Sequence, residues 1–107
     1  MKTFFGSTFI NSEKLREENK NYPIKLEYYK VINEDELNKN KATKFGINII
    51  KTEYMNNNTK VEEKAIKYLS NDEQKINEIL DMLKQNEFTP ICLQDIIMDL
   101  SKQILFL

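Results

Sequence analysis

Two apolar patterns near the end of the chain, separated by a very short turn, constrain its fold more than any other feature. The first predicts a helix over about residues 71–85, because Ile76, Ile79, Leu80 and Leu83 follow one another at spacings of three, one and three. The second predicts a helix over about residues 90–105, with a core face of Leu93, Ile96, Ile97, Leu100 and Ile104. Because only about three residues separate them, the two helices must pack as neighbours.

Both helices carry start signals. Ser70 and Glu73 have the spacing of a capping box, in which the serine oxygen accepts from the third helical amide and the glutamate reaches back to the serine amide. Thr89 is expected to cap the second helix, with Pro90 at its first position, where a missing amide proton costs nothing.

Alternating apolar residues predict three strands before the helices. The apolar face of residues 24–32 holds Ile24, Leu26 and Tyr28, and that of residues 44–54 holds Phe45, Ile47 and Ile49. Three consecutive Asn residues within 55–59 indicate a hairpin turn to a third strand over about residues 61–69. The register of that strand stays open, because Val61, Ala65 and Leu69 share one parity and Ile66 and Tyr68 share the other; a bulge would reconcile them.

Strands first and helices last predict an α+β fold, with an antiparallel sheet of three to four strands covered on one face by a C-terminal helical hairpin. The fourth strand would come from the aromatic segment TFFGSTFI. We expect residues 1–22 to form this N-terminal aromatic segment and a polar connector, and residues 23–107 to form a single α+β domain. A length of 107 residues suits one core.

The second helix carries more apolar residues than one buried face requires. Ile91, Met98 and Leu105 recur at every seventh residue, on the side opposite the core face. One interpretation is that a strand or the N-terminal aromatic residues cover this strip, which would make it core. The other is that the strip is exposed and binds a partner helix or a second copy of the chain in a homodimer. These three residues are therefore the candidate partner-binding residues.

The chain offers little for catalysis. It has no histidine and one cysteine, Cys92, which would lie in the first turn of a helix with no base beside it. Glu62 and Glu63 are consecutive on a strand and point to opposite faces, so they cannot act at one site. The consecutive acids at positions 34–36 lack the further ligands of a cation site. We therefore expect no enzyme activity, no cofactor, no metal and no small-molecule substrate.

The distribution of charge disfavours nucleic acid as a partner. Residues 1–70 hold 13 Lys or Arg against 10 Asp or Glu, a net charge of +3, whereas residues 71–107 hold 3 against 7, a net charge of −4. The alternative function, a DNA-binding regulator with a helical hairpin and a β-wing, would bring this acidic half to the major groove, with Gln94 as its only plausible base-reading residue. Phosphate contacts would then fall to lysines of the sheet half, such as Lys44, Lys51, Lys60, Lys64 and Lys67.

The length of the apolar runs and the cysteine content indicate the compartment in which the protein acts. Apolar runs stay well short of the roughly 20 residues that a membrane-spanning helix needs, and polar residues interrupt the N-terminal apolar segment before it reaches the length of a signal peptide's core. A single cysteine fits a reducing compartment. We expect a cytoplasmic protein, without membrane binding, that serves as a protein-protein interaction or regulatory module.

Three segments in order, LEYYKVI, KFGINIIKTEY and SNDEQKINEILDMLKQNEFTPICLQDIIMDL, resemble a family of small uncharacterised proteins from clostridia and related spore-forming Firmicutes, classed as a domain of unknown function. The resemblance covers about residues 24–100. Its most specific part is an S-x-D-x-x-K helix start, an N-x-x-T-P turn and an L-x-D-I-I-x-D-L helix, here Ser70, Asp72, Lys75, Asn86, Thr89, Pro90, Leu93, Asp95, Ile96, Ile97, Asp99 and Leu100. The resemblance implies a small α+β domain and supplies no activity, cofactor or catalytic residue.

Overall fold

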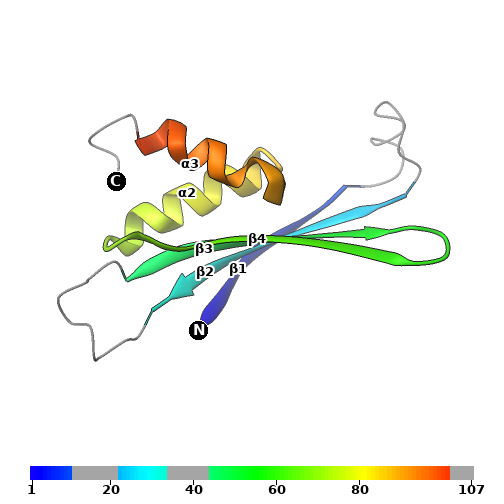
Figure 1. Cartoon of the computed structure of the whole chain (residues 1–107), viewed down its shortest axis with the longest axis horizontal. Coiled ribbons are helices and arrows are strands. Elements are labelled where there is room, and N and C mark those ends of the chain that lie inside the picture. Colours follow the sequence, from blue (N-terminus) through cyan, green and yellow to red (C-terminus); the bar gives the residue numbers. More distant parts are fainter. Residues whose placement is uncertain (11–21, 34–43, 102–107) are drawn as a thin grey trace.

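One antiparallel sheet carries two helices on one of its faces in the computed structural model, which describes residues 1–10, 22–33 and 44–101 (Figure 1). The strands are β1 (Lys2–Ile10), β2 (Ile24–Ile32), β3 (Phe45–Tyr54) and β4 (Thr59–Ser70), each antiparallel to the next in the order β1-β2-β3-β4. The helices are α2 (Glu73–Gln85), the short 3-10 helix η2 (Pro90–Cys92) and α3 (Leu93–Ser101). The expected α+β fold is confirmed.

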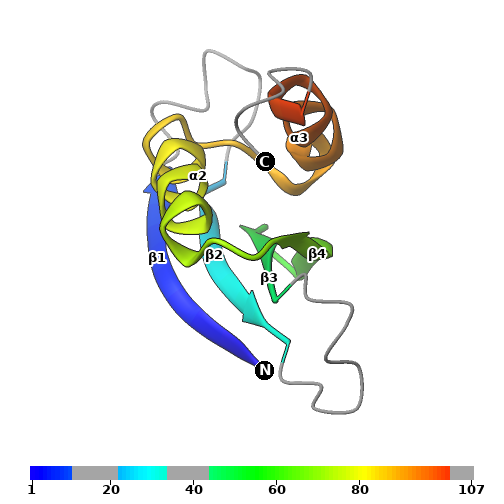
Figure 2. The same ribbon diagram turned by 90° about the vertical axis from the view of Figure 1, so that its left-hand side faces the viewer.

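The core lies between alternate residues of the two central strands and the apolar stripe of α2. Leu26 and Tyr28 of β2 and Ile47 and Ile49 of β3 are fully buried, because every second side chain of a strand points to the same face. The helix layer contributes Ile76, Ile79, Leu80 and Leu83 from α2 and Leu93 and Ile97 from α3. As Figure 2 shows, both helices lie over the same face of the sheet, with α2 packed on β2 and β3, and η2 and α3 packed on β4.

The N-terminal aromatic segment is the fourth strand. β1 pairs with β2 from Lys2 opposite Val31 to Ile10 opposite Ile24, with an irregularity between Phe4 and Gly6. The expected division of the chain at about residue 22 stays a prediction. Residues 11–21, which belong to the expected polar connector, and residues 34–43 lie outside the described residues.

A bulge in β4 resolves the register that the sequence leaves open. Phe45 is opposite Ser70 and Ile47 is opposite Ile66, so Gly46 between them faces three residues of β4. The extra residues let Ile66 and Leu69 both pack against the core although they differ in parity. Gly46 is required there, because a Cβ atom at this position would lie 2.2 Å from the carbonyl oxygen of Ile66.

The first helix starts later than the capping box predicts. Ser70 remains in β4, opposite Phe45, and its hydroxyl accepts a hydrogen bond from the amide of Asp72 at 3.1 Å. Asp72 is the N-cap: its Oδ1 accepts from the amides of Gln74 at 3.0 Å and Lys75 at 3.4 Å. The expectation that Ser70 caps the helix was therefore wrong, because strand pairing continues as far as Ser70 itself and leaves the capping position to the next acid.

Glu73, the other half of the expected capping box, has a different partner. Its carboxylate forms a 2.9 Å ion pair with Lys30 of β2 and so ties the start of α2 to the sheet.

The second helix begins at the expected place but in two parts. Thr89 has the extended backbone of an N-cap and Pro90 follows at the first position, yet the threonine side chain makes no capping hydrogen bond. Its Oγ1 lies 3.6 Å from the Sγ of Cys92 instead. A 3-10 turn therefore precedes α3, which the structure describes as far as Ser101. Ile104 of the expected core face lies outside the described residues.

Replacing Asp72 with Ala should lower the free energy of unfolding by about 1 kcal/mol, because two amides at the start of α2 lose their acceptor. The measurement is the midpoint of chemical denaturation. Glu78, exposed in the middle of the same helix, provides the control, since Glu78→Ala removes a similar charge without removing a cap. Equal effects of the two substitutions would contradict the assignment of the cap.

Replacing Gly46 with Ala should destabilise the protein by about 3 kcal/mol, because the new methyl group meets the backbone of β4. Gly6→Ala is the matched control in another strand. There the methyl group meets only the end of the Lys84 side chain, at 2.9 Å from Cδ, and a flexible lysine can move aside. Thermal melts should separate the two variants clearly, and similar melting temperatures would mean that the bulge does not require glycine.

Candidate functional site

The turn between the two helices is fixed by backbone hydrogen bonds. The amide of Phe88 donates to the carbonyl of Leu83 at 3.0 Å and the amide of Glu87 donates to that of Lys84 at 3.1 Å, which is the Schellman arrangement of a helix end. Glu87 has a φ of 54°, the left-handed backbone that this arrangement needs. The position of η2 and α3 is thus set within one turn of the end of α2.

A buried tyrosine anchors the same turn to the sheet. The hydroxyl of Tyr28, at the centre of β2, donates a 2.9 Å hydrogen bond to the carbonyl of Phe88. Burial raises the pKa of Tyr28 far above its ordinary value, and the charge of Glu87 adds to the effect. The hydroxyl therefore stays protonated and keeps donating. Phe88 itself packs against the core.

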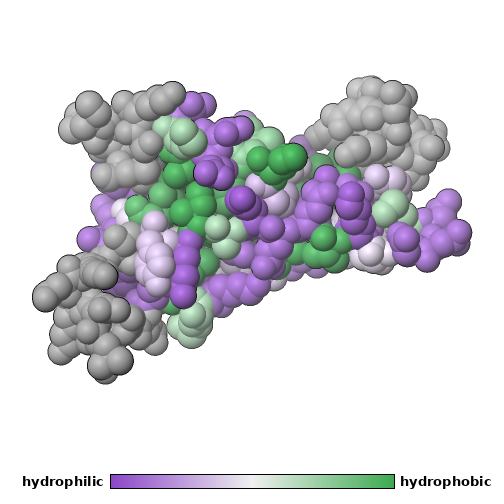
Figure 3. All heavy atoms as spheres, viewed as in Figure 1, coloured by the Kyte–Doolittle hydropathy of each residue, from purple (hydrophilic) through white to green (hydrophobic). Residues whose placement is uncertain are grey.

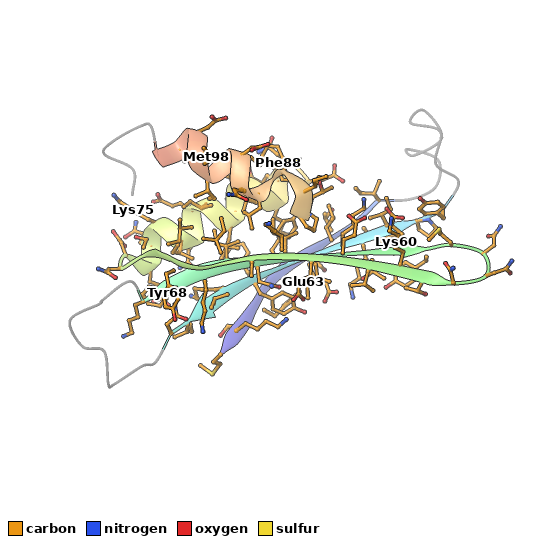
Figure 4. The ribbon with its side chains drawn as sticks, in the orientation of Figure 1. Lys60, Glu63, Tyr68, Lys75, Phe88 and Met98 are labelled. Carbon is orange, nitrogen blue, oxygen red and sulfur yellow. The ribbon has the colours of Figure 1, made fainter. Side chains whose placement is uncertain are left out.

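Two of the three candidate partner-binding residues are exposed on this rigid support. Ile91 of η2 exposes 81% of its surface and Met98 of α3 exposes 53%. Leu105 lies outside the described residues. Phe88 and Met98 both belong to the helix layer above the sheet (Figure 4). Their binding role stays a prediction, but Ile91 is not a core residue.

A groove runs beside Ile91, between the edge strand β4 and the start of α3. Its lining consists of Glu62, Glu63 and Lys64 from β4, Pro90 and Ile91 from η2, and Gln94 and Asp95 from α3. Figure 3 shows hydrophobic atoms in the helix layer and again at the level of β4, with hydrophilic atoms between them. Ile91 is thus an apolar side chain on the wall of a mixed groove.

The face of the sheet away from the helices carries a second apolar surface, which the sequence analysis missed. Here we call it the outer face; it exposes Phe4, Phe9, Tyr54, Val61 and Tyr68. The ring of Phe4 contacts that of Tyr29, and the ring of Phe9 contacts that of Tyr54. Glu63 and Tyr68 lie on this side in Figure 4, whereas Lys60 lies on the helix side. The sequence did carry a signal for this surface, namely aromatic residues at strand positions that face outward.

Charges on the outer face form ion pairs, one between two strands and one within β2. The Nζ of Lys2 lies 4.0 Å from the carboxylate of Glu63 and 4.6 Å from the ring centre of Tyr29. The carboxylate of Glu27 lies 3.9 Å from the Nζ of Lys25 and accepts a 2.8 Å hydrogen bond from the hydroxyl of Tyr29. That hydrogen bond raises the pKa of Tyr29. Glu62 and Glu63 point to opposite faces, as expected from the strand period.

A charged cluster lies on the helix side of the sheet, near the β3–β4 hairpin. Lys51 and Glu53, both buried, form a 2.8 Å ion pair, and Glu62 lies 3.8 Å from the same lysine. Burial lowers the pKa of Lys51, but its hydrogen bond and charge attraction to Glu53, with the further charge of Glu62, outweigh burial and raise it overall. Tyr22 donates a 3.1 Å hydrogen bond to Glu53. Lys51 is therefore held protonated.

The remaining residues singled out by the sequence do not come together with this cluster. Cys92 is half-buried at the start of the second helix, next to Thr89. The acids at positions 34–36 lie outside the described residues. In the described ranges, no helix is long and apolar enough to cross a membrane.

Comparison with known proteins places the chain in a family without assigning it an activity. Neither a search of curated proteins nor a search of solved structures returns a match. One family model, described as "Family of unknown function (DUF6514)", matches residues 7–103, which include all four strands in whole or in part and both helices. Because this match covers most of the chain, it establishes the family to which the chain belongs, in agreement with the resemblance to a domain of unknown function. The protein is a member of the DUF6514 family.

Proposed function

We propose that this protein is a non-enzymatic interaction or regulatory module that binds a partner protein through the strip of Ile91 and Met98. The observation that carries the proposal is the exposure of Ile91, at 81% of its surface, on a turn whose position is fixed by the core. A large apolar side chain held rigidly beside a groove is the kind of anchor on which protein interfaces concentrate their binding energy. It also loses little conformational freedom on binding.

The charge around the strip indicates the chemistry of the partner. Gln94, Asp95 and Asp99 are exposed on α3 between and beside Ile91 and Met98. Residues 71–107 carry a net charge of −4. A complementary partner presents an apolar side chain flanked by Lys or Arg, because opposite charges steer association and disfavour acidic competitors.

Two observations support binding rather than catalysis. Lys51, a buried amine, is held in its charged form by Glu53, whereas a nucleophilic lysine needs a lowered pKa. Cys92 has a threonine hydroxyl beside it, and the chain contains no histidine to act as its base. A single cysteine also supports a cytoplasmic location for the module.

Ion pairs of the sheet lysines favour a protein partner over duplex DNA. Lys51 pairs with Glu53, and Lys60 lies 3.3 Å from the carboxylate of Glu62. Lysines neutralised by neighbouring acids supply little of the uncompensated charge that phosphate binding requires.

Substituting Ile91 with Asp should weaken binding of the physiological partner at least about tenfold, because it replaces an apolar anchor with a charge. The partner is isolated by affinity capture with the full chain, purified, and titrated against wild type and variant by calorimetry. Because Ile91 is exposed, the variant should keep the circular dichroism spectrum and melting temperature of the wild type. Binding to the wild type should also weaken as salt is raised.

Gln74→Asp is the control, since Gln74 is exposed on α2, outside both the strip and the outer face, and the change introduces the same charge. It should leave partner binding within about twofold of wild type. The proposal fails if no captured protein binds the purified chain directly, or if the captured protein binds Ile91→Asp as tightly as wild type.

A further inference from the structure

The outer face of the sheet is a broad apolar surface that lies apart from the helix layer. Phe9 and Val61, on opposite edge strands, expose 60% and 59% of their surfaces. Four strands about 5 Å apart, each about nine residues long at about 3.3 Å per residue, give this face a projected area of about 600 Å². That area is of the same order as the about 800 Å² that each partner of a stable complex buries.

The charge on this face selects its occupant. Lys2 is balanced by Glu63 and Lys25 by Glu27, whereas Lys67, whose Nζ lies 5.4 Å from the ring centre of Tyr68, adds one positive charge. A nucleic acid needs several uncompensated cations, and a strongly charged protein needs an opposite field; the described residues of this face offer neither. Two identical copies of a face with so small a net charge meet with little repulsion.

We propose that the outer face binds a second copy of this chain in a two-fold symmetric dimer, with the symmetry axis parallel to the strands and between β2 and β3. The two sheets then pack face to face about 10 Å apart, with their strands roughly aligned. In this arrangement β1 of one copy lies over β4 of the other, and β2 lies over β3.

The strand register decides which residues meet. Phe9 is paired with Lys25, Lys25 with Thr52, and Thr52 with Val61, so these residues form one row across the sheet. A two-fold axis parallel to the strands places this row over the same row of the second copy, in the opposite order. Phe9 therefore meets Val61 of the second copy, and Val61 meets Phe9 of the second copy. Two equivalent apolar contacts form at the two edges of the interface.

An axis across the strands is disfavoured by charge. Glu27 is paired with Ile50 and Ile50 with Glu63, so both acids lie in the central row of the face. A two-fold axis along that row would place each glutamate directly against its own copy, and like charges directly opposite each other are unfavourable. The axis along the strands places Glu27 over Ile50 and Glu63 over Ser7 of the second copy instead.

Complementary charges at the predicted contact test both the interface and its symmetry. Phe9→Lys alone and Val61→Glu alone should each weaken self-association of the full chain at least about 100-fold, because symmetry repeats each change at two contacts. A mixture of the two variants should associate again. At one edge of the mixed dimer the introduced lysine faces the introduced glutamate, and at the other edge an unchanged Phe9 meets an unchanged Val61. Sedimentation equilibrium at micromolar concentrations measures all three samples.

Ile91→Asp is the matched control from the other surface and should self-associate like wild type, so that failure of this dimer and failure of partner binding at α3 are distinguishable. Circular dichroism checks the fold of each variant. Should either variant unfold, Phe9→Glu with Val61→Lys makes the same test with the charges exchanged. A wild type that stays monomeric, single variants that dimerise as tightly as wild type, or a mixture of folded variants that stays monomeric would each overturn the proposal.

Discussion

The hydrogen bond from the Tyr28 hydroxyl to the carbonyl of Phe88 joins the two layers of this protein at one point. Tyr28 is fully buried at the centre of β2, and Phe88 is the residue at which the chain leaves α2 and turns toward α3. A buried hydroxyl without a partner is costly, so the sheet fixes where the turn must lie. The left-handed backbone of Glu87 then sends the chain into η2 in a single direction. The exposure of Ile91 follows from this geometry.

In the part of the chain that the structure describes, helices cover one face of the sheet and leave the other face to solvent or to a partner. In a sheet that stays in water, outward positions are usually polar, because the strand period separates a buried set from an exposed set. Here the outward positions include Phe4, Phe9 and Val61. Their rings and methyl groups are unfavourable to leave in water, at roughly 25 cal/mol for each Å² of apolar surface. This imbalance supports a partner on the outer face more strongly than composition could.

The two proposed surfaces lie on opposite sides of the molecule and have different chemistry. The strip on the helix layer is small and lies in an acidic environment, so it suits a partner with an apolar anchor and basic flanks. The outer face is large and carries little net charge, so it suits a second copy of the same chain. Dimerisation through the sheet would leave both α3 strips exposed, and a dimer would then present two partner sites. Linked sites of this kind increase apparent affinity without any new contact.

The sequence by itself determined the α+β class, the buried faces of β2, β3 and α2, and the position of the turn before Pro90, because each depends on a local period or on one residue's backbone. Tertiary structure decided the rest. Ser70 was expected to cap α2, but pairing with Phe45 keeps it in the strand, and a distant strand is invisible to a local motif. The same limit applies to the bulge opposite Gly46, and to the outer face, whose apolar character depends on which side the helices cover. Side chains at Phe9 and Val61 are far apart in sequence, and only the strand register places them in one row across the sheet.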